Sequence, residues 1–404
     1  MLDVVIIGGG IGGINSALFL SKTKNTLLLD ERSYWGGRLI TNKQPHYEMG
    51  AARFNNNHKL LTKLINKYKL TKIKLPQSID YLDINKELYI KDVHKLLDYY
   101  FENLVKLSKK YKSQELKKMT LFEFMNKCNN IECSEKIVSM FGYYSEIKAM
   151  NAYDALRSFG EDFVNVKYFI LKDGLSKLCT KMIEDIKRQG GICKTDSFVK
   201  DVKKEDKCFL VKTQGETYKC KKVVFAIKAH QLKSFQLLSP VHKYIESVHD
   251  SELLRIYAKY PVRKNGPWFS KLRRMTTNSF LRQIIPIDYT SGLIMISYTD
   301  GEDISVYKDK KDKLLKETKI KQLIQTELSK IFKHINIPQP TYFKTHYWNV
   351  GAHHWKPNYD SKVISKKMLN PMKNVYICGE SFSTKQAWIE GALETSMQVI
   401  NLIH

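Results

Sequence analysis

The sequence lacks paired cysteines. Its 404 residues include 7 cysteines, an odd number, and no Cys-x-x-Cys pair occurs. We therefore expect neither a disulfide framework nor a structural zinc site. The adjacent His353 and His354 have no third ligand at a readable spacing, so no metal is expected there either. Unpaired thiols are typical of a reducing compartment, which predicts an intracellular, cytoplasmic protein.

Long apolar segments are also missing. No stretch is apolar enough to cross a bilayer. Asp3 stands where a secretory leader would carry positive charge, and the apolar run after it leads directly into Gly8, Gly9 and Gly10. We therefore expect neither a leader peptide nor a transmembrane anchor.

Acidic residues are scarce relative to basic ones. The chain has 67 Lys and Arg against 41 Asp and Glu, a formal net charge of +26. Such an excess can attract nucleic acid, anionic membranes or acidic substrates. However, the lysines are spread along the chain and no specific nucleic-acid motif accompanies them. A general surface charge is therefore favoured, and a polyanion-binding surface stays open as an alternative.

The first 30 residues have the pattern of a βαβ unit. An apolar run from Asp3 to Ile7 predicts a strand, the glycines 8–13 a tight turn, Ile14 to Lys22 a helix, and Thr26 to Leu29 a second strand. This is the context that a dinucleotide-binding fingerprint requires.

Other segments are assigned by hydrophobic spacing. The pattern predicts helices over 92–159, 175–186 and 310–334 and from Ala387 onward, and strands near 198–202, 209–212, 223–227 and 375–378 and within 253–299. A length of 404 residues with 43% hydrophobic content is sufficient for one large or two intermeshed domains.

The glycine-rich turn satisfies Gly-x-Gly-x-x-Gly. Gly8 permits the tight turn, Gly10 lets the backbone approach a pyrophosphate, and Gly13 lets the helix pack closely on the strand. The helix N-terminus then supplies free N–H groups for the phosphates. Asp30, at the end of the second strand, is placed to accept hydrogen bonds from the ribose hydroxyls.

The segments that follow distinguish FAD from NAD. The stretch 30–38, which ends in Gly36-Gly37-Arg38, resembles the segment after the second strand in the flavin-containing amine oxidase family. The stretches 375–380 and 387–392 resemble that family's closing strand with its Gly-Glu pair and the start of its last helix beneath the flavin. The resemblance implies an FAD site formed by Gly8, Gly10, Ile11, Gly12, Gly13, Asp30, Glu31, Arg32, Gly37, Arg38, Gly50, Ala51, Ala52, Arg53, Val199, Gly379, Glu380, Trp388, Ile389 and Ala392.

The same resemblance implies the fold. It is an α/β fold with a glutathione-reductase-type, Rossmann-like FAD-binding domain and an inserted α+β substrate domain. The discontinuous FAD-binding domain is expected to comprise 1–70, 170–240 and 360–404. The substrate domain then has a helical part, 71–169, and a part with sheet and helix, 241–359.

The stretch 48–54 points to the substrate. It resembles the Gly-x-Met-Arg stretch of L-amino-acid oxidases and tryptophan monooxygenases, which implies that Arg53 holds a substrate carboxylate. Pairing of Arg53 with FAD phosphate or a protein acid is the alternative. By the same resemblance Ala387 and Trp388 line the substrate pocket. Trp348 is expected to form a second wall, with a structural role as the alternative.

The sequence departs from the family at the lysine that holds a water against flavin N5. Arg274 occupies that position in our alignment, and Lys271 is the substitute if the alignment is displaced. The tyrosine that joins the arginine in gripping carboxylate has no clear counterpart. No cysteine occurs between 221 and 377, so the family's covalent flavin link is missing and FAD should be non-covalent.

The reaction implied is oxidation of a C–N bond in an amine or L-amino acid. Hydride passes to flavin N5, the imine is hydrolysed, and O2 reoxidises the flavin and forms H2O2. Two alternatives stay open: another FAD enzyme of the superfamily, such as a desaturase or a protoporphyrinogen-oxidase-like dehydrogenase, and a catalytically weak flavoprotein with a polyanion-binding surface. A homodimer also stays open.

Overall fold

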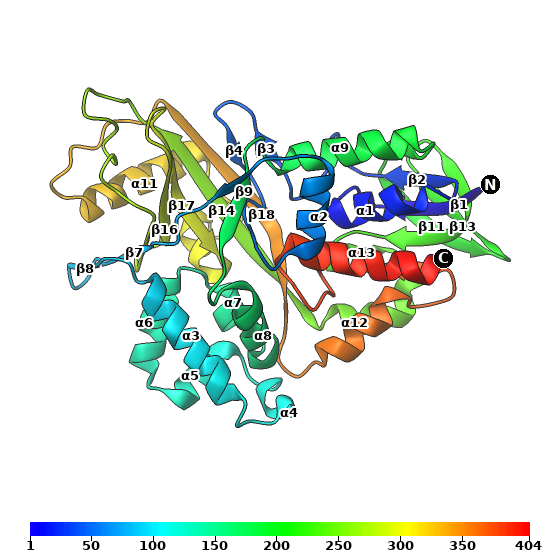
Figure 1. Ribbon diagram of the computed structural model, residues 1–404, viewed down its shortest axis with the longest axis horizontal. Helices are drawn as coiled ribbons and strands as arrows, with labels where there is room; N and C mark the ends of the chain where they lie inside the picture. Colours follow the sequence, from blue (N-terminus) through cyan, green and yellow to red (C-terminus); the bar gives the residue numbers. More distant parts are fainter. The chain divides into compact units, whose positions relative to one another are not determined.

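The computed structural model describes residues 1–404, which form two compact units (Figure 1). Unit 1 comprises Met1–Leu75, Val166–His249 and Ala352–His404. Unit 2 comprises Pro76–Asn165 and Asp250–Gly351. The sequence placed the corresponding boundaries at residues 70, 170, 240 and 360. Each unit is therefore assembled from segments that lie far apart in the sequence.

Unit 1 is built on a seven-stranded sheet whose strand order is β10-β2-β1-β13-β12-β11, with β19 paired to β13. The strands are β1 (Leu2–Ile7), β2 (Thr26–Leu29), β10 (Ile192–Lys194), β11 (Val199–Glu205), β12 (Cys208–Thr213), β13 (Thr217–Phe225) and β19 (Val375–Ile377). The pairs among β10, β2, β1, β13 and β19 are parallel, whereas β11, β12 and β13 form an antiparallel meander. All four residues of β2 are buried, as expected for a strand covered on both faces.

Three helices accompany this sheet in Figure 1: α1 (Ile11–Leu20), α9 (Leu175–Arg188) and α13 (Ile389–Ile403). Helix α1 packs against both α9 and α13. Their buried faces share one core with residues of β1 and β2, including Val4, Ile6 and Leu28. Unit 1 also contains the helices α2 (Lys59–Lys67) and α12 (Ser361–Leu369). The core thus fixes the N-termini of α1 and α13 at the carboxyl ends of parallel strands.

The last helix begins two residues later than the sequence pattern indicates. Ala387 has a left-handed backbone, with φ of 64°, and Trp388 is the extended N-cap residue before Ile389. Ala387 is therefore part of a turn rather than of the helix, which corrects the expected helix start.

A second seven-stranded sheet, ordered β18-β14-β17-β16-β15-β7-β8, belongs mainly to unit 2, although β14 begins and β18 ends in residues of unit 1. Its strands are β7 (Asp80–Asp83), β8 (Leu88–Ile90), β14 (Val248–Lys259), β15 (Met275–Thr277), β16 (Gln283–Asp288), β17 (Leu293–Asp300) and β18 (Tyr342–Trp355). Two small sheets, β3 (Thr41–Asn42) with β4 (Tyr47–Glu48), and β5 (Phe54–Asn55) with β9 (Tyr168–Leu171) and β6 (Lys72–Lys74), belong to unit 1.

The helical part of unit 2 consists of separate helices. They are α3 (His94–Ser108), α4 (Ser113–Leu116), α5 (Leu121–Cys128), α6 (Ile131–Phe141), α7 (Ser145–Lys148) and α8 (Ala152–Asp162). The helix expected over 310–334 is shorter: α11 covers Glu317–Ile331, and Leu314, before its start, forms a β-bridge with Lys308 instead. No helix of either unit is long and apolar enough to span a membrane.

Candidate cofactor and substrate site

The turn between β1 and α1 needs glycine at two positions for internal packing. Gly8 has φ of 107°, and a Cβ atom there would lie 2.4 Å from the carbonyl oxygen of Ala226. A Cβ atom at Gly13 would lie 1.9 Å from the carbonyl oxygen of Gly8. Both distances are far below van der Waals contact, so these two glycines hold helix and strand together as the fingerprint predicts.

Gly10 has a different reason to be glycine. Its backbone is extended, with φ of −70°, a conformation open to any residue, and a Cβ atom there would meet no protein atom within 4 Å. Gly379 likewise faces open space, and Gly37 lies so close that its Cβ would be 3.2 Å from the Cα of Gly10. Gly10 and Gly379 therefore face space that no protein atom fills, with Gly37 beside Gly10; this is the glycine-lined space.

The N-terminus of α1 opens toward this space. Its N-cap is Gly10, which offers no capping side chain, and its first turn contains no acidic residue. Uncapped N–H groups and the positive end of the helix dipole form a binding site for an anion such as a pyrophosphate. The residues present therefore fit the diphosphate of a dinucleotide such as FAD.

Asp30 lies next to this turn. One carboxylate oxygen, Oδ2, accepts a hydrogen bond from the Gly9 N–H at 2.5 Å, and the other, Oδ1, accepts from the Arg32 N–H at 2.8 Å. Burial raises the pKa of the Asp30 carboxyl above its usual range, although these two N–H groups oppose the shift. The contacts fix the carboxylate at the end of β2, where a ribose would reach it.

The neighbouring residues of the same segment are held in place. Arg32 donates from Nη1 to the Tyr34 hydroxyl at 2.8 Å and to the Gly37 carbonyl at 3.1 Å. Glu31 accepts from the Gln231 side chain at 3.4 Å. The loop 30–38 is thus held by Arg32 from within and by Gln231 from outside the loop.

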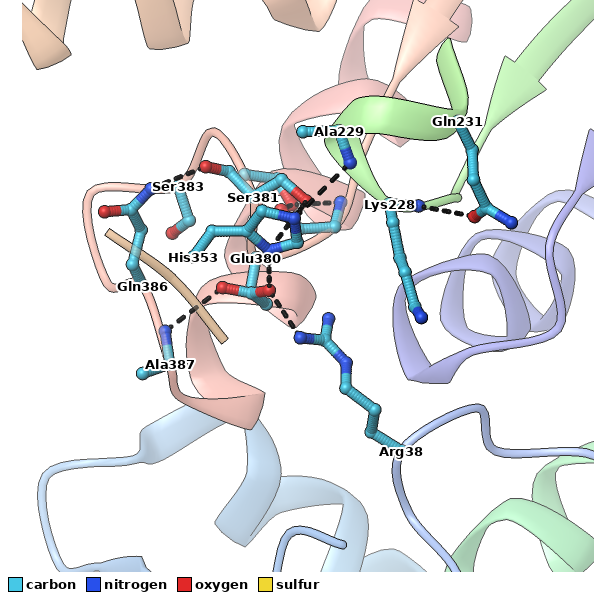
Figure 2. Close-up of polar contacts among 12 residues, drawn as sticks. Arg38, Lys228, Ala229, Gln231, His353, Glu380, Ser381, Ser383, Gln386 and Ala387 are labelled. Carbon is cyan, nitrogen blue, oxygen red and sulfur yellow. Dashed lines mark hydrogen bonds and ion pairs between the residues drawn. The ribbon is translucent and has the colours of Figure 1, made fainter. Parts of the chain in front are cut away.

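Glu380 lies at the centre of a buried polar network, shown in Figure 2. Its Oε1 atom is 2.7 Å from Nη1 of Arg38 and 2.5 Å from Nδ1 of His353. Its Oε2 atom accepts from the Ala387 N–H at 3.1 Å. Burial alone would raise the pKa of this carboxyl, but His353 and Arg38 outweigh it and hold the pKa well below its usual range.

Arg53 lies among aromatic side chains of unit 1. The centre of its guanidinium is 4.7 Å from the ring centroid of Tyr168 and 6.0 Å from that of Trp388. These two rings are stacked with centroids 6.3 Å apart, and His58 meets Trp388 edge-on at 4.9 Å. The structure therefore brings together Arg53 and Trp388, two residues that the sequence assigned to the substrate.

The segment that carries Arg53 is fixed to the segment that carries Arg38, because the Ala51 N–H donates to the Arg38 carbonyl at 2.9 Å. At the other end, Glu390 in the first turn of α13 accepts from the N–H groups of Leu60 and Leu61, at 2.7 and 3.0 Å. Gly50 through Arg53 and Trp388 through Ala392 are thus held in one unit. Val199 begins β11 next to an irregularity in its pairing with β12.

The remaining predicted residues belong to unit 2. Arg274 is half-buried, and its Nη2 donates to the Gln283 side chain at 3.0 Å. Lys271 is exposed, and Trp348 is half-buried on β18. The roles assigned to these three residues from the sequence remain predictions.

Sequence reasoning did not find three residues that the structure brings forward. Tyr168 and His353 reach their partners through contacts between distant segments, for which the sequence carries no local signal. Arg255 is a buried cation on β14 whose guanidinium lies 4.5 Å from the Tyr298 ring. Burial opposes its charge, but the surrounding tyrosines raise the pKa of Arg255 above its usual range.

Comparison with known proteins gives a family match and a fold match. The family "Flavin containing amine oxidoreductase" matches residues 11–399. Three solved structures of putrescine oxidase, two cofactor-binding redesigns and the wild type bound to putrescine, have TM-scores of 0.79, 0.78 and 0.80. They are 13 to 14% identical to this chain, covering 100% of it and 98% of theirs, so they show a shared fold.

A curated relative supports only a local comparison. Uncharacterized protein R188 of Acanthamoeba polyphaga mimivirus is 36% identical over 99 residues, which are 22% of this chain and 19% of that protein. The match therefore spans about a fifth of that relative's length.

Proposed function

The chain belongs to the flavin-containing amine oxidoreductase family, and from this premise we propose that it binds FAD non-covalently and oxidises an L-amino acid or a related amine that bears a carboxylate. The observation that carries the cofactor part is the glycine-lined space at the uncapped N-terminus of α1, flanked by Asp30. The observation that carries the substrate part is the arginine, Arg53, beside Trp388.

The binding of FAD would be divided among four segments of unit 1. The N–H groups at the start of α1 would bind the pyrophosphate, and the Asp30 carboxylate would accept from the ribose. Gly37 and Gly379 keep side chains out of the space, while Arg38 contributes a cation next to it. No cysteine occurs between 221 and 377, which supports non-covalent binding.

Bound FAD would supply the acceptor for the two electrons and the hydrogen that leave the substrate C–N unit. The protein would position the reactants and would supply the electrostatic field around the flavin ring. The N-terminus of α13, which begins at Ile389, presents the positive end of a helix dipole, and such a dipole favours negative charge at the ring. Trp388, only 9% exposed, would keep water from the reacting face.

Arg53 would orient the substrate. A planar guanidinium can hold a carboxylate with two parallel hydrogen bonds, which fixes the α-carbon as well as the charge. The rings of Tyr168 and Trp388 restrict where this guanidinium can lie. A fixed cation would also repel a second ammonium group, so the site disfavours diamines relative to amino acids.

An aerobic screen tests the proposal. The purified protein is expected to be yellow and to release its flavin on acid precipitation. With L-amino acids it should produce peroxide, with O2 as electron acceptor, faster than with polyamines or monoamines. A colourless protein that binds no added FAD, or turnover of putrescine without turnover of any amino acid, would contradict it.

A further inference from the structure

His353 is the most deeply buried ionisable partner in the network around Glu380. It lies near the end of β18, in unit 1, with none of its surface exposed. Its Nδ1 atom is 2.5 Å from Oε1 of Glu380. Because this contact is buried, loss of the imidazole would leave the Glu380 carboxylate without one of its donors.

The surroundings indicate which ring nitrogen carries the proton. The Ala229 N–H points at Nε2 of His353 at 3.4 Å, so Nε2 acts as an acceptor. Nδ1 then carries the hydrogen and donates it to Glu380. The hydroxyl of Ser381, 3.3 Å from Nδ1 and 3.4 Å from Nε2, can adapt to either nitrogen. A neutral imidazole with the proton on Nδ1 satisfies all of these contacts.

Besides His353, Glu380 contacts two segments that lie next to the glycine-lined space. Figure 2 shows Arg38 and Ala387 approaching the same carboxylate from opposite sides. Arg38 ends the glycine-rich loop 36–38, and Ala387 is the left-handed turn residue before α13. The orientation of the carboxylate therefore sets the positions of both segments.

We infer that His353 is a positioning residue of the FAD site: by donating to Glu380 it holds the Arg38 loop and the turn before α13 in the arrangement that binds the cofactor. This inference rests on the proposed function. His353 does not act on FAD directly; it acts through Glu380.

The charged groups around His353 support this assignment. Glu380 and, through it, Arg38 face the imidazole. The adjacent His354 stays neutral, because burial lowers its pKa to about 3 despite the nearby Glu380. Without the hydrogen bond from Nδ1, the effect of burial on the carboxyl would be less strongly opposed, and the pKa of Glu380 would rise.

The test compares His353→Leu with His353→Asn, whose side-chain amide can place an N–H near the position of Nδ1. Flavin is removed from each protein and the Kd for FAD is measured by fluorescence quenching from pH 8 down to pH 4. The control is His346→Leu, since His346 is a buried histidine on the same strand but in unit 2.

His353→Leu should weaken FAD binding at least about tenfold, His353→Asn should recover most of that loss, and His346→Leu should match the wild type. His353→Leu should also lose FAD at a higher pH than the wild type, because Glu380 becomes protonated more easily. Equal affinity and equal pH dependence in His353→Leu, or an equal loss in His346→Leu, would overturn the inference. Wild-type protein that binds no FAD would instead defeat the proposed function.

Discussion

Arg38 and Glu380 form an ion pair, with Nη1 and Oε1 2.7 Å apart, that links the loop after β2 to the segment after β19. The Arg38 side chain is 24% exposed and the Glu380 side chain only 7%. A buried pair of this kind adds little net stability over apolar packing, but the loss of one partner leaves an uncompensated charge. The pair thus makes the geometry of the candidate FAD site depend on two residues from opposite ends of the chain.

Replacement of one member of this pair should be costly. Glu380→Gln should lower the free energy of unfolding by about 3 kcal/mol, because Arg38 and His353 lose an ionised acceptor. Arg38→Gln should cost less, since part of its side chain reaches solvent. Urea unfolding of the flavin-free proteins measures both losses in the free energy of unfolding. The sum of the two single-variant losses should clearly exceed the loss measured for the double variant. Strict additivity would show that the residues are not coupled.

The same carboxylate should give stability a dependence on pH. Its pKa in the folded state lies below the ordinary value of 4.5, so the unfolded chain binds the proton more readily. The contribution of Glu380 is therefore complete above about pH 4.5 and is lost as the pH falls below it. Unfolding free energies of wild type and Glu380→Gln should converge between pH 6 and pH 3, by about 1 kcal/mol or more. Parallel curves would mean that Glu380 is not held ionised.

Two glycines of the fingerprint should respond in opposite ways to substitution. Gly10→Val should fold, because the backbone is extended and the added Cβ meets no protein atom, yet it should lose FAD binding by about a hundredfold or more. Gly13→Ala should instead destabilise the fold, because its Cβ would lie 1.9 Å from the Gly8 carbonyl. Thermal unfolding followed by circular dichroism, together with FAD titration, separates the two effects. Retained FAD binding in Gly10→Val would place the pyrophosphate elsewhere.

The local part of the candidate cofactor site could be predicted from the sequence. The glycine turn and Asp30 are local signals, because their spacing follows from one βαβ unit, and in the structure the Gly9 N–H of the turn donates to the Asp30 carboxylate. Contacts between distant segments carry no such signal. Tyr168 reaches Arg53 because β9 pairs with β5, and His353 reaches Glu380 because β18 ends beside the segment after β19.

The element boundaries that the sequence missed have the same physical origin. Ala387 has helical propensity, but its N–H is taken by the Glu380 carboxylate and its backbone is left-handed, so the helix starts later. The apolar spacing before α11 continues a helical pattern, whereas a bridge between Lys308 and Leu314 takes those residues out of the helix. In both cases a tertiary contact overrides local propensity.

Arg53 should control selectivity for substrates that carry a carboxylate. Arg53→Ala removes a charge-assisted hydrogen bond and should cost about 2–4 kcal/mol of transition-state binding for an amino acid. For a simple amine without a carboxylate the loss in kcat/KM should be much smaller. Arg53→Lys keeps the charge but not the paired geometry, so it should recover only part of the loss. Equal losses on both substrate types, with FAD content intact, would make Arg53 structural.

Arg274 should make the reaction with oxygen slow relative to the reaction with substrate. Its guanidinium is fixed by a hydrogen bond to Gln283, whose amide in turn donates to the Gly142 carbonyl at 3.2 Å. If Arg274 takes the position of the family's lysine, it is too large to hold a water in the same way, and it stays charged. A fixed cation near the flavin would favour the anionic reduced ring, which speeds reduction. Without the water contact, reoxidation should be slow.

Stopped-flow measurement of the two half-reactions tests this expectation for Arg274. Arg274→Lys should raise the rate of reoxidation about tenfold, equivalent to about 1.4 kcal/mol in the barrier, and should slow anaerobic reduction. Lys271→Met tests the competing candidate, and it should leave both rates unchanged if Arg274 holds the position of the family's lysine. If Arg274→Lys leaves reoxidation unchanged while Lys271→Met alters it, the two residues exchange roles. In that case the cation that acts at the flavin is the exposed Lys271, and the guanidinium of Arg274 serves to hold Gln283 against Gly142.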